Sequence, residues 1–181
     1  EGLKYIYRHP KLRYQVFQLM LTICTIYPLM VAVFRVFVQS KFQLTQTSFG
    51  QAFSFPALGS MLGALTFTVI KPKHPERALM FGVPLVCIMI SLLQAFSTLS
   101  LTVFAMTLTG YGLYLTFASL TVSMQLAVDE AYRGRLSSVI GMGFSAIGPI
   151  MCFPWGHLAD AIGSVNTIYI CGLVFGVGSA S

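Results

Sequence analysis

The chain has 181 residues, of which 56% are hydrophobic and only 9% are charged. A soluble domain carries about 25% charged residues, and 11 basic and 5 acidic side chains cannot cover the water-exposed surface of a chain this long. This composition excludes an ordinary soluble globular domain and a disordered chain. It indicates a protein whose outer surface meets lipid.

The positions of the charges predict how often the chain crosses the membrane. No charged residue occurs between Ala78 and Val128, and a single helix of that length would be more than twice as long as the hydrocarbon core of about 30 Å is thick. That run must cross twice, and the other charge-free runs are each about one crossing long. We therefore predict an all-α membrane protein in which residues 14–181 form a six-helix bundle. The expected spans are 14–37, 49–70, 78–96, 100–128, 136–158 and 165–181.

The first expected helix, 14–37, carries polar side chains at helical spacing. Gln18, Thr22 and Thr25 follow one another at i, i+4 and i+7, so they share one face of the helix. This stripe is a candidate wall of a substrate cavity, and packing against a neighbouring helix is the alternative.

The second expected helix, 49–70, has a capping signal and a pair of glycines. Ser48 precedes Gln51 by three residues, which fits a capping box at the start of the helix. Gly59 and Gly63 are four residues apart, a spacing that lets two membrane helices approach closely. We expect this contact within the bundle, with dimerisation as the alternative. A tight polar turn separates the third helix, 78–96, from the fourth.

The fourth expected helix, 100–128, repeats the polar pattern of the first. Thr107, Tyr111 and Tyr114 lie on one face, and a tyrosine in mid-span needs a partner or water for its hydroxyl group. These three residues are the other candidates for lining a cavity, and packing against a neighbouring helix is again the alternative.

The fifth expected helix, 136–158, is rich in glycine and proline, which favour bending. The pattern fits either a gating helix or a locally irregular packed helix. The candidate hinge residues are Gly141, Gly143, Gly148 and Pro149.

The chain lacks the side-chain arrangements of an enzyme. The four cysteines all fall in apolar spans without metal-ligand spacing. There is no phosphate-binding glycine loop, no Ser-His-Asp arrangement and no pair of carboxylates in a pocket. We predict no enzymatic activity, no metal and no cofactor. The carboxylates near spans, Asp129, Glu130 and Asp160, lie at helix ends, so a proton carrier, if protons drive the protein, is expected outside this chain.

The basic residues predict the orientation, because Lys and Arg concentrate on the cytoplasmic side. Nine of them fall on the side that holds the first residues, against Arg35 and Lys41 on the other. Both ends are therefore expected in the cytoplasm. The net charge of +6 is then explained by topology and lipid headgroups, without a nucleic-acid partner.

Several segments, in this order, resemble the major facilitator superfamily of transporters. The nearest subgroup is that of bacterial exporters similar to the enterobactin exporter, also called transmembrane secretion effectors. The segments are Glu1–Ile6 with Arg8–Arg13, Asp129–Arg135, Gly148-Pro149, and Gly156-x-x-x-Asp160-x-x-Gly163.

This resemblance implies that the chain is the C-terminal half of such a transporter, helices seven to twelve with the last one truncated. Residues 1–13 would be the cytoplasmic linker, and the six spans would form two inverted three-helix repeats. The implied function is secondary active export of a drug-, siderophore- or metabolite-like molecule by alternating access in the bacterial inner membrane. Its partners would be lipid, the N-terminal half, a small-molecule substrate and, as an open question, protons.

The resemblance also implies a cytoplasmic gate, with one departure from the family pattern. The loop between the second and third helices has basic residues but lacks the Asp that the family often has there. The expected gate residues are Asp129, Glu130, Arg133 and Arg135. The competing readings are an importer or facilitator, a six-helix scaffold or partner-binding protein, and, more weakly, a membrane-embedded enzyme.

Overall fold

A computed structural model describes residues 10–43, 46–72, 75–93 and 95–180. Most of the expected linker, including Lys4 and Arg8, lies outside these residues. The described part of the chain is helical, with no strands, which confirms the all-α prediction. In chain order the elements are α2 (Pro10–Pro28), η1 (Leu29–Val33), α3 (Phe34–Phe42), α4 (Gln46–Ile70), α5 (Pro75–Leu92), α6 (Leu99–Ala127), α7 (Glu130–Met142), η2 (Gly143–Ile147), α8 (Gly148–Ile162) and α9 (Ser164–Ala180).

Five continuous helices are long and apolar enough to cross a membrane: Leu12–Phe42, Ala52–Ile70, Pro75–Leu92, Leu99–Ala127 and Tyr132–Ile162. A shorter apolar helix, Ser164–Ser179, follows them. These lengths and compositions indicate an integral membrane protein. Their bounds lie close to the expected spans, except that the first and fifth helices extend further. The capping box predicted at Ser48 is wrong, because α4 begins at Gln46 and Ser48 is already helical.

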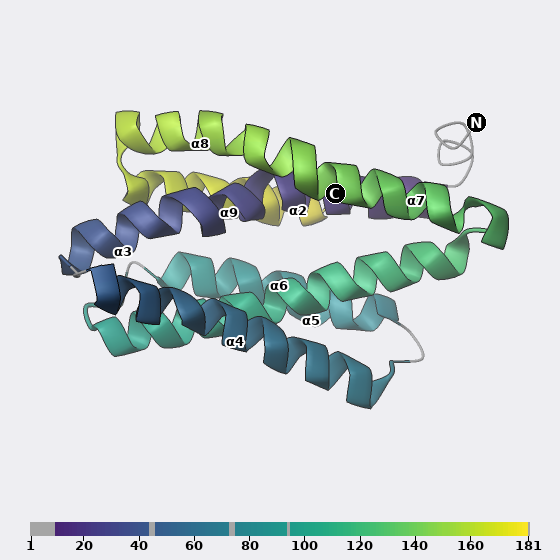
Figure 1. Ribbon diagram of the computed structural model, residues 1–181, viewed down its shortest axis with the longest axis horizontal. Helices are drawn as coiled ribbons and strands as arrows, with labels where there is room; N and C mark the ends of the chain where they lie inside the picture. Colours follow the sequence, from purple (N-terminus) through teal and green to yellow (C-terminus); the bar gives the residue numbers. More distant parts are fainter. Residues whose placement is uncertain (1–9, 44–45, 73–74, 94, 181) are drawn as a thin grey trace.

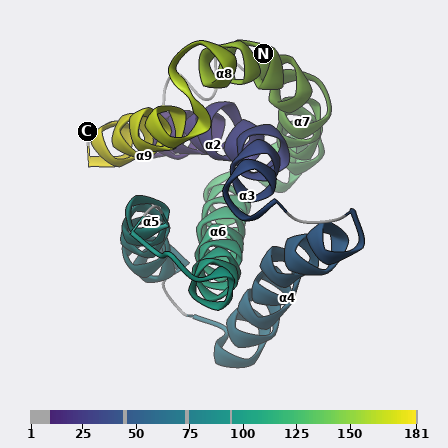
Figure 2. The ribbon, with the colours of Figure 1, turned by 90° about the vertical axis from the view of Figure 1, so that its left-hand side faces the viewer.

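The helices form two groups that meet along α2 and α6 and along α5 and α9 (Figures 1 and 2). In one group, α2 and its continuation α3 pack against α8 and α9; in the other, α6 packs against α4 and α5. The α4–α5 and α6–α7 connections lie at the end where α2 begins, and the connections after α3, α5 and α8 lie at the opposite end (Figure 1). The chain therefore alternates between two ends, as successive membrane crossings require.

Glycines determine how closely α4 and α6 approach each other. A Cβ atom added to Gly59 would collide with the backbone carbonyl of Thr107, and one added to Gly110 would collide with that of Pro56. A Cβ on Gly63 would lie 3.0 Å from the carbonyl oxygen of Tyr111. Only glycine permits backbone-to-backbone contact of this kind. The predicted packing of Gly59 and Gly63 within the bundle is confirmed.

Two of the long helices contain a π-helical turn, in which the N–H group bonds to the carbonyl five residues earlier. In η1 the N–H of Phe34 donates to Leu29, directly after Pro28. Proline has no N–H and crowds the preceding turn, which explains the local widening there. In η2 the N–H of Gly148 donates to the carbonyl of Gly143. Two predicted hinge residues, Gly143 and Gly148, therefore lie at the two ends of this segment.

Candidate functional site

A hollow of about 380 Å³, open to its surroundings and called the cavity below, lies where the two groups of helices meet. Its volume falls within the range of small-molecule sites. Helices α2, α4 and α6 and both π-helical turns contribute to its wall. The lining residues are Thr22, Ile26, Tyr27, Met30, Ser60, Leu113, Tyr114, Phe117 and Phe144.

Aromatic rings form one side of this cavity. The rings of Phe117 and Phe144 meet edge to face, with centroids 5.1 Å apart and planes at 90°. Tyr27 meets the same Phe144 ring at 6.2 Å and 75°. Phe144 belongs to η2, and the Tyr27 ring packs where a Cβ on Gly148 would come within 2.9 Å of it. The aromatic wall therefore depends on the path of the π-helical turn and on the small residue that ends it.

The aliphatic hydroxyl groups in the wall use their protons on backbone carbonyls. Thr22 Oγ1 donates to the carbonyl of Gln18 at 2.8 Å. Ser60 Oγ lies 3.0 Å from the carbonyl oxygen of Pro56 and 3.2 Å from that of Gly110. Each of these hydroxyl groups has one proton, and a backbone carbonyl lies within hydrogen-bond distance of each. The close crossing of α4 and α6 holds Ser60 within reach of Gly110.

Of the first polar stripe, Thr22 lines the cavity, whereas Gln18 and Thr25 are not among its described lining residues. Thr25 is 3% exposed and donates its hydroxyl to the carbonyl of Leu21 at 2.7 Å. Its own carbonyl faces α9, where Cys171 Sγ approaches at 3.1 Å. Thr25 therefore contributes to packing between α2 and α9.

Gln18 is buried to 1% exposure, and neither atom of its side-chain amide has a hydrogen-bond partner among the described residues. The Oε1 atom of Gln15, one turn earlier, is also unpaired, and so is Oγ1 of Thr121 on α6. A buried polar atom without a partner costs roughly 1–3 kcal/mol. This end of the α2–α6 contact therefore carries a polar group that its surroundings do not satisfy.

Of the second stripe, Tyr114 lines the cavity, and all three residues lie against α4. Thr107 Oγ1 donates to the carbonyl of Val103 at 2.9 Å. The backbone of Thr107 lies against Gly59 and that of Tyr111 against Gly63. The structure therefore brings one candidate from each stripe, Thr22 and Tyr114, to the same cavity.

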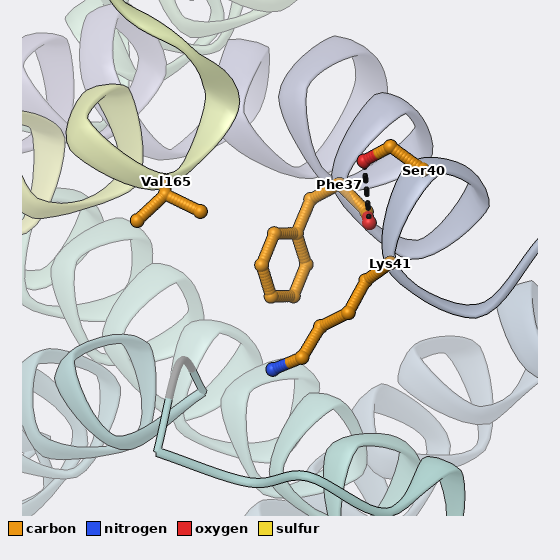
Figure 3. A pocket seen from close by; sticks show the side chains of 4 residues that line it. All are labelled: Phe37, Ser40, Lys41 and Val165. Carbon is orange, nitrogen blue, oxygen red and sulfur yellow. Dashed lines mark hydrogen bonds between the residues drawn. The ribbon is translucent and has the colours of Figure 1, made fainter.

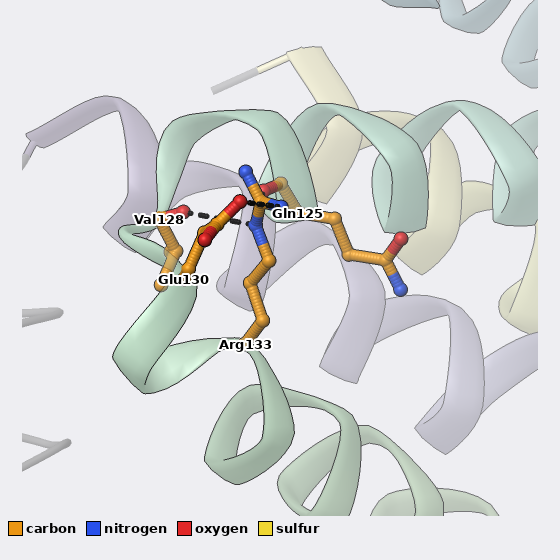
Figure 4. A network of polar contacts seen from close by, with 4 residues as sticks. All are labelled: Gln125, Val128, Glu130 and Arg133. Atoms are coloured by element: carbon orange, nitrogen blue, oxygen red, sulfur yellow. Dashed lines mark hydrogen bonds and ion pairs between the residues drawn. The ribbon is translucent and has the colours of Figure 1, made fainter.

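The expected gate residues lie together at the α6–α7 connection, and Arg133 is the centre of their contacts (Figure 4). Its Nε donates to the carbonyls of Gln125 at 3.1 Å and Val128 at 3.3 Å, and its guanidinium lies 3.6 Å from the Glu130 carboxylate. These bonds satisfy carbonyls at the C-terminus of α6, which the helix itself leaves unpaired. Arg133 thus ties the end of α6 to the start of α7.

The other two gate candidates occupy the same turn. Asp129 stands at the residue before α7, without a side-chain capping bond. The Arg135 guanidinium lies 5.6 Å from the centre of the Tyr132 ring, within the range of a cation–π contact.

The four hinge candidates have different surroundings. Gly143 and Gly148 are buried against α2, where a Cβ would meet the side chains of Ile23 and Tyr27. Gly141 has nothing within 4 Å of its would-be Cβ, and Pro149 is exposed. The two glycines that bound η2 are thus the ones whose size determines a helix contact.

A second hollow of about 360 Å³ lies at the far end of the bundle, between α3 and α9 (Figure 3). Phe37, Ser40, Lys41 and Val165 line it. Lys41 Nζ donates to the carbonyl of Phe96 at 2.7 Å and lies 5.1 Å from the centre of the Phe37 ring. The ammonium group joins α3 to the turn before α6.

Sequence reasoning did not select Tyr27, Ser60, Phe117 and Phe144, all of which line the cavity. Ser60 directly follows Gly59, in a segment whose small residues indicate packing. The aromatic residues have no distinguishing spacing in a chain with 15 Phe and 8 Tyr. Among the described residues there is no cluster of three His, Cys, Asp or Glu side chains that could hold a metal ion.

Comparison of the chain with protein-family models, with curated proteins and with solved structures finds no significant match. The resemblance to the major facilitator superfamily therefore stays a prediction, and the functional argument depends on the cavity and the helices around it.

Proposed function

We propose that this chain is one half of a secondary transporter of the major facilitator type, which exports a small molecule from the bacterial cytoplasm by alternating access. The observation that carries the proposal is the cavity of about 380 Å³. Two helices with π-helical turns border it, and residues from both polar stripes, Thr22 and Tyr114, line it. Binding sites of secondary transporters lie at the contact of helical repeats and involve irregular helices.

The pairing of helices also supports the proposal. In the first group α2 packs against α8 and α9, and in the second α6 packs against α4 and α5. The first helix of each three-helix unit thus packs against the last two helices of the other unit. This is the pairing expected of two three-helix repeats related by a pseudo-two-fold axis. In the proposed transporter, α2 and α6 form the wall of the central cavity, and the N-terminal half supplies the opposite wall.

The proposed orientation places the end with the α4–α5 and α6–α7 connections in the cytoplasm. Lys71, Arg77, Arg133 and Arg135 lie in these connections or in the first turns of the helices that follow them, in keeping with the excess of basic residues on that side of a membrane protein. In the proposed cycle, Arg133 and its partners stabilise the cytoplasmic end of the closed state.

Dye efflux tests the proposal. Cells without their own multidrug exporters would express the gene product that carries this chain and be loaded with ethidium, Hoechst 33342 or rhodamine 6G. We expect faster energy-dependent efflux of at least one dye, reduced in Tyr114→Ala and unchanged in Phe153→Ala, whose side chain is 84% exposed. Efflux equal to that of empty-vector cells for all three dyes would overturn the transport proposal and favour a scaffold.

A further inference from the structure

We propose that Trp155, on α8, fixes the path of α2 beside the cavity by donating a hydrogen bond to a backbone carbonyl that Pro28 leaves without its usual helical donor. The inference concerns the shape of α2 and does not depend on the transport proposal. The carbonyl belongs to Cys24, near the middle of the continuous apolar helix Leu12–Phe42.

The hydrogen-bond ladder of α2 is interrupted at Cys24. In an α-helix the N–H group four residues later would donate to its carbonyl, but that residue is Pro28, which has no N–H group. The π-helical turn Leu29–Val33 follows directly. The hydroxyl of Thr25 also donates back to the Leu21 carbonyl at 2.7 Å, a bond that tends to bend a helix. The backbone bonds of α2 alone therefore do not fix its path through these residues.

Side chains of two neighbouring helices donate to the carbonyls at this break. Trp155 Nε1 donates to the Cys24 carbonyl at 2.8 Å, and Cys171 Sγ, on α9, lies 3.1 Å from the Thr25 carbonyl. Successive residues of an α-helix are rotated by about 100°, so the two carbonyls face different neighbours. Helix α2 packs against both α8 and α9 (Figure 2).

The bond from Trp155 is harder to replace than the contact from Cys171. Residue 29 is leucine and keeps an N–H group that can serve the Thr25 carbonyl, whereas Pro28 offers none to Cys24. A thiol is also a weaker donor than an indole N–H group. Inside a bilayer no water takes the place of a lost donor. Without the indole N–H, α2 must rearrange at the break or keep an unpaired carbonyl.

The same segment of α2 forms part of the cavity wall. Thr22, Ile26 and Tyr27 stand on either side of Cys24 in the sequence and line the cavity, whereas Trp155 is not among its described lining residues. Trp155 is therefore a positioning residue, which acts on the wall through the backbone of α2.

Hydrogen exchange of the purified full-length protein tests this role. Trp155→Phe keeps an aromatic ring and removes the N–H donor, so the amides of residues 29–34 should exchange roughly 5- to 150-fold faster, as expected when a carbonyl loses its partner. Pro28→Ala supplies the missing backbone N–H group. In a Pro28→Ala protein, the further change Trp155→Phe should therefore accelerate exchange by less than about 3-fold.

Equal acceleration by Trp155→Phe in both backgrounds would show that the ring acts by packing alone and would overturn the proposal. Exchange at wild-type rates in Trp155→Phe would overturn it as well. If Trp155→Phe yields no folded protein, recovery of folding on adding Pro28→Ala would support the proposal, and failure to recover would overturn it.

Cys171→Ala is the matched control at the neighbouring carbonyl. It should accelerate exchange less than Trp155→Phe does, because Leu29 keeps its N–H group. An equal or larger acceleration would contradict the importance of the missing proline donor. None of these measurements uses dye efflux, so failure of the transport proposal leaves their meaning unchanged.

Discussion

The crossing of α4 and α6 should not tolerate a single methyl group at Gly59. In Gly59→Ala the new Cβ collides with the backbone carbonyl of Thr107, an atom that cannot move aside as a flexible side chain would. The two helices must separate, and overpacking of this kind costs about 3 kcal/mol, the upper end of the usual range. Separation also weakens the 3.2 Å bond from Ser60 to the Gly110 carbonyl, which adds about 1 kcal/mol.

Thermal unfolding of the purified protein measures this cost. For a chain of this size each kcal/mol shifts Tm by about 2–4 °C, so Gly59→Ala should unfold about 8–16 °C below the wild type. Gly50→Ala is the matched control on the same helix, because its Cβ would meet nothing within 4 Å. Alanine gains helix propensity there, so its Tm should equal or exceed that of the wild type. A Gly59→Ala protein that unfolds within 2 °C of Gly50→Ala would refute the close crossing.

Three further predictions depend on other contacts. Gln18→Met replaces an unpaired buried amide with an apolar side chain of similar length, so Tm should rise by several degrees, for a gain of about 1–3 kcal/mol. The exposed control Gln39→Met should leave Tm unchanged, and a lower Tm of the Gln18→Met protein would contradict the assigned burial. Arg133→Ala removes the Nε–H group that the carbonyls of Gln125 and Val128 share, so amide exchange in residues 125–129 should accelerate roughly 3- to 10-fold. Exchange at wild-type rates would show that Arg133 does not hold this turn. Gly148→Ala pushes a methyl group against the Tyr27 ring and should slow dye efflux several-fold. The same slowing in Gly141→Ala, which has open space, would rule out a local cause.

The sequence predicted the helices well because charge-free length and helical spacing are local properties. The loop between Ile70 and Pro75 and the one around Asp129 divide the chain where the structure does. The predicted helix bounds are wrong where a helix extends beyond its apolar part, as it does at the start of α4 at Gln46 and of α7 at Glu130. Nothing in local sequence forbids the extra turns there.

The candidate site was only partly predictable, because spacing assigns residues to a face and does not say which helix that face meets. Thr107, Tyr111 and Tyr114 share a face of α6, yet Gly59 and Gly63 bring α4 against the first two. Gly63 also lies against the Tyr114 side chain, yet only Tyr114 of the three lines the cavity. Ser60 and Phe144 reach it through a helix crossing and a π-helical turn, both of which depend on tertiary contacts.

Accessibility of a cavity residue from the two sides of the membrane tests alternating access most directly. Tyr114→Cys would be placed in a protein in which Cys24, Cys87, Cys152 and Cys171 are replaced by alanine, and treated with a membrane-impermeant maleimide. Right-side-out and inside-out vesicles would be compared with the same protein that keeps Tyr114 and has no cysteine in this chain, as the unlabelled control. The account predicts labelling of Tyr114→Cys in both kinds of vesicle, because the cavity opens to each side in turn. Labelling from one side alone, or from neither, would contradict it.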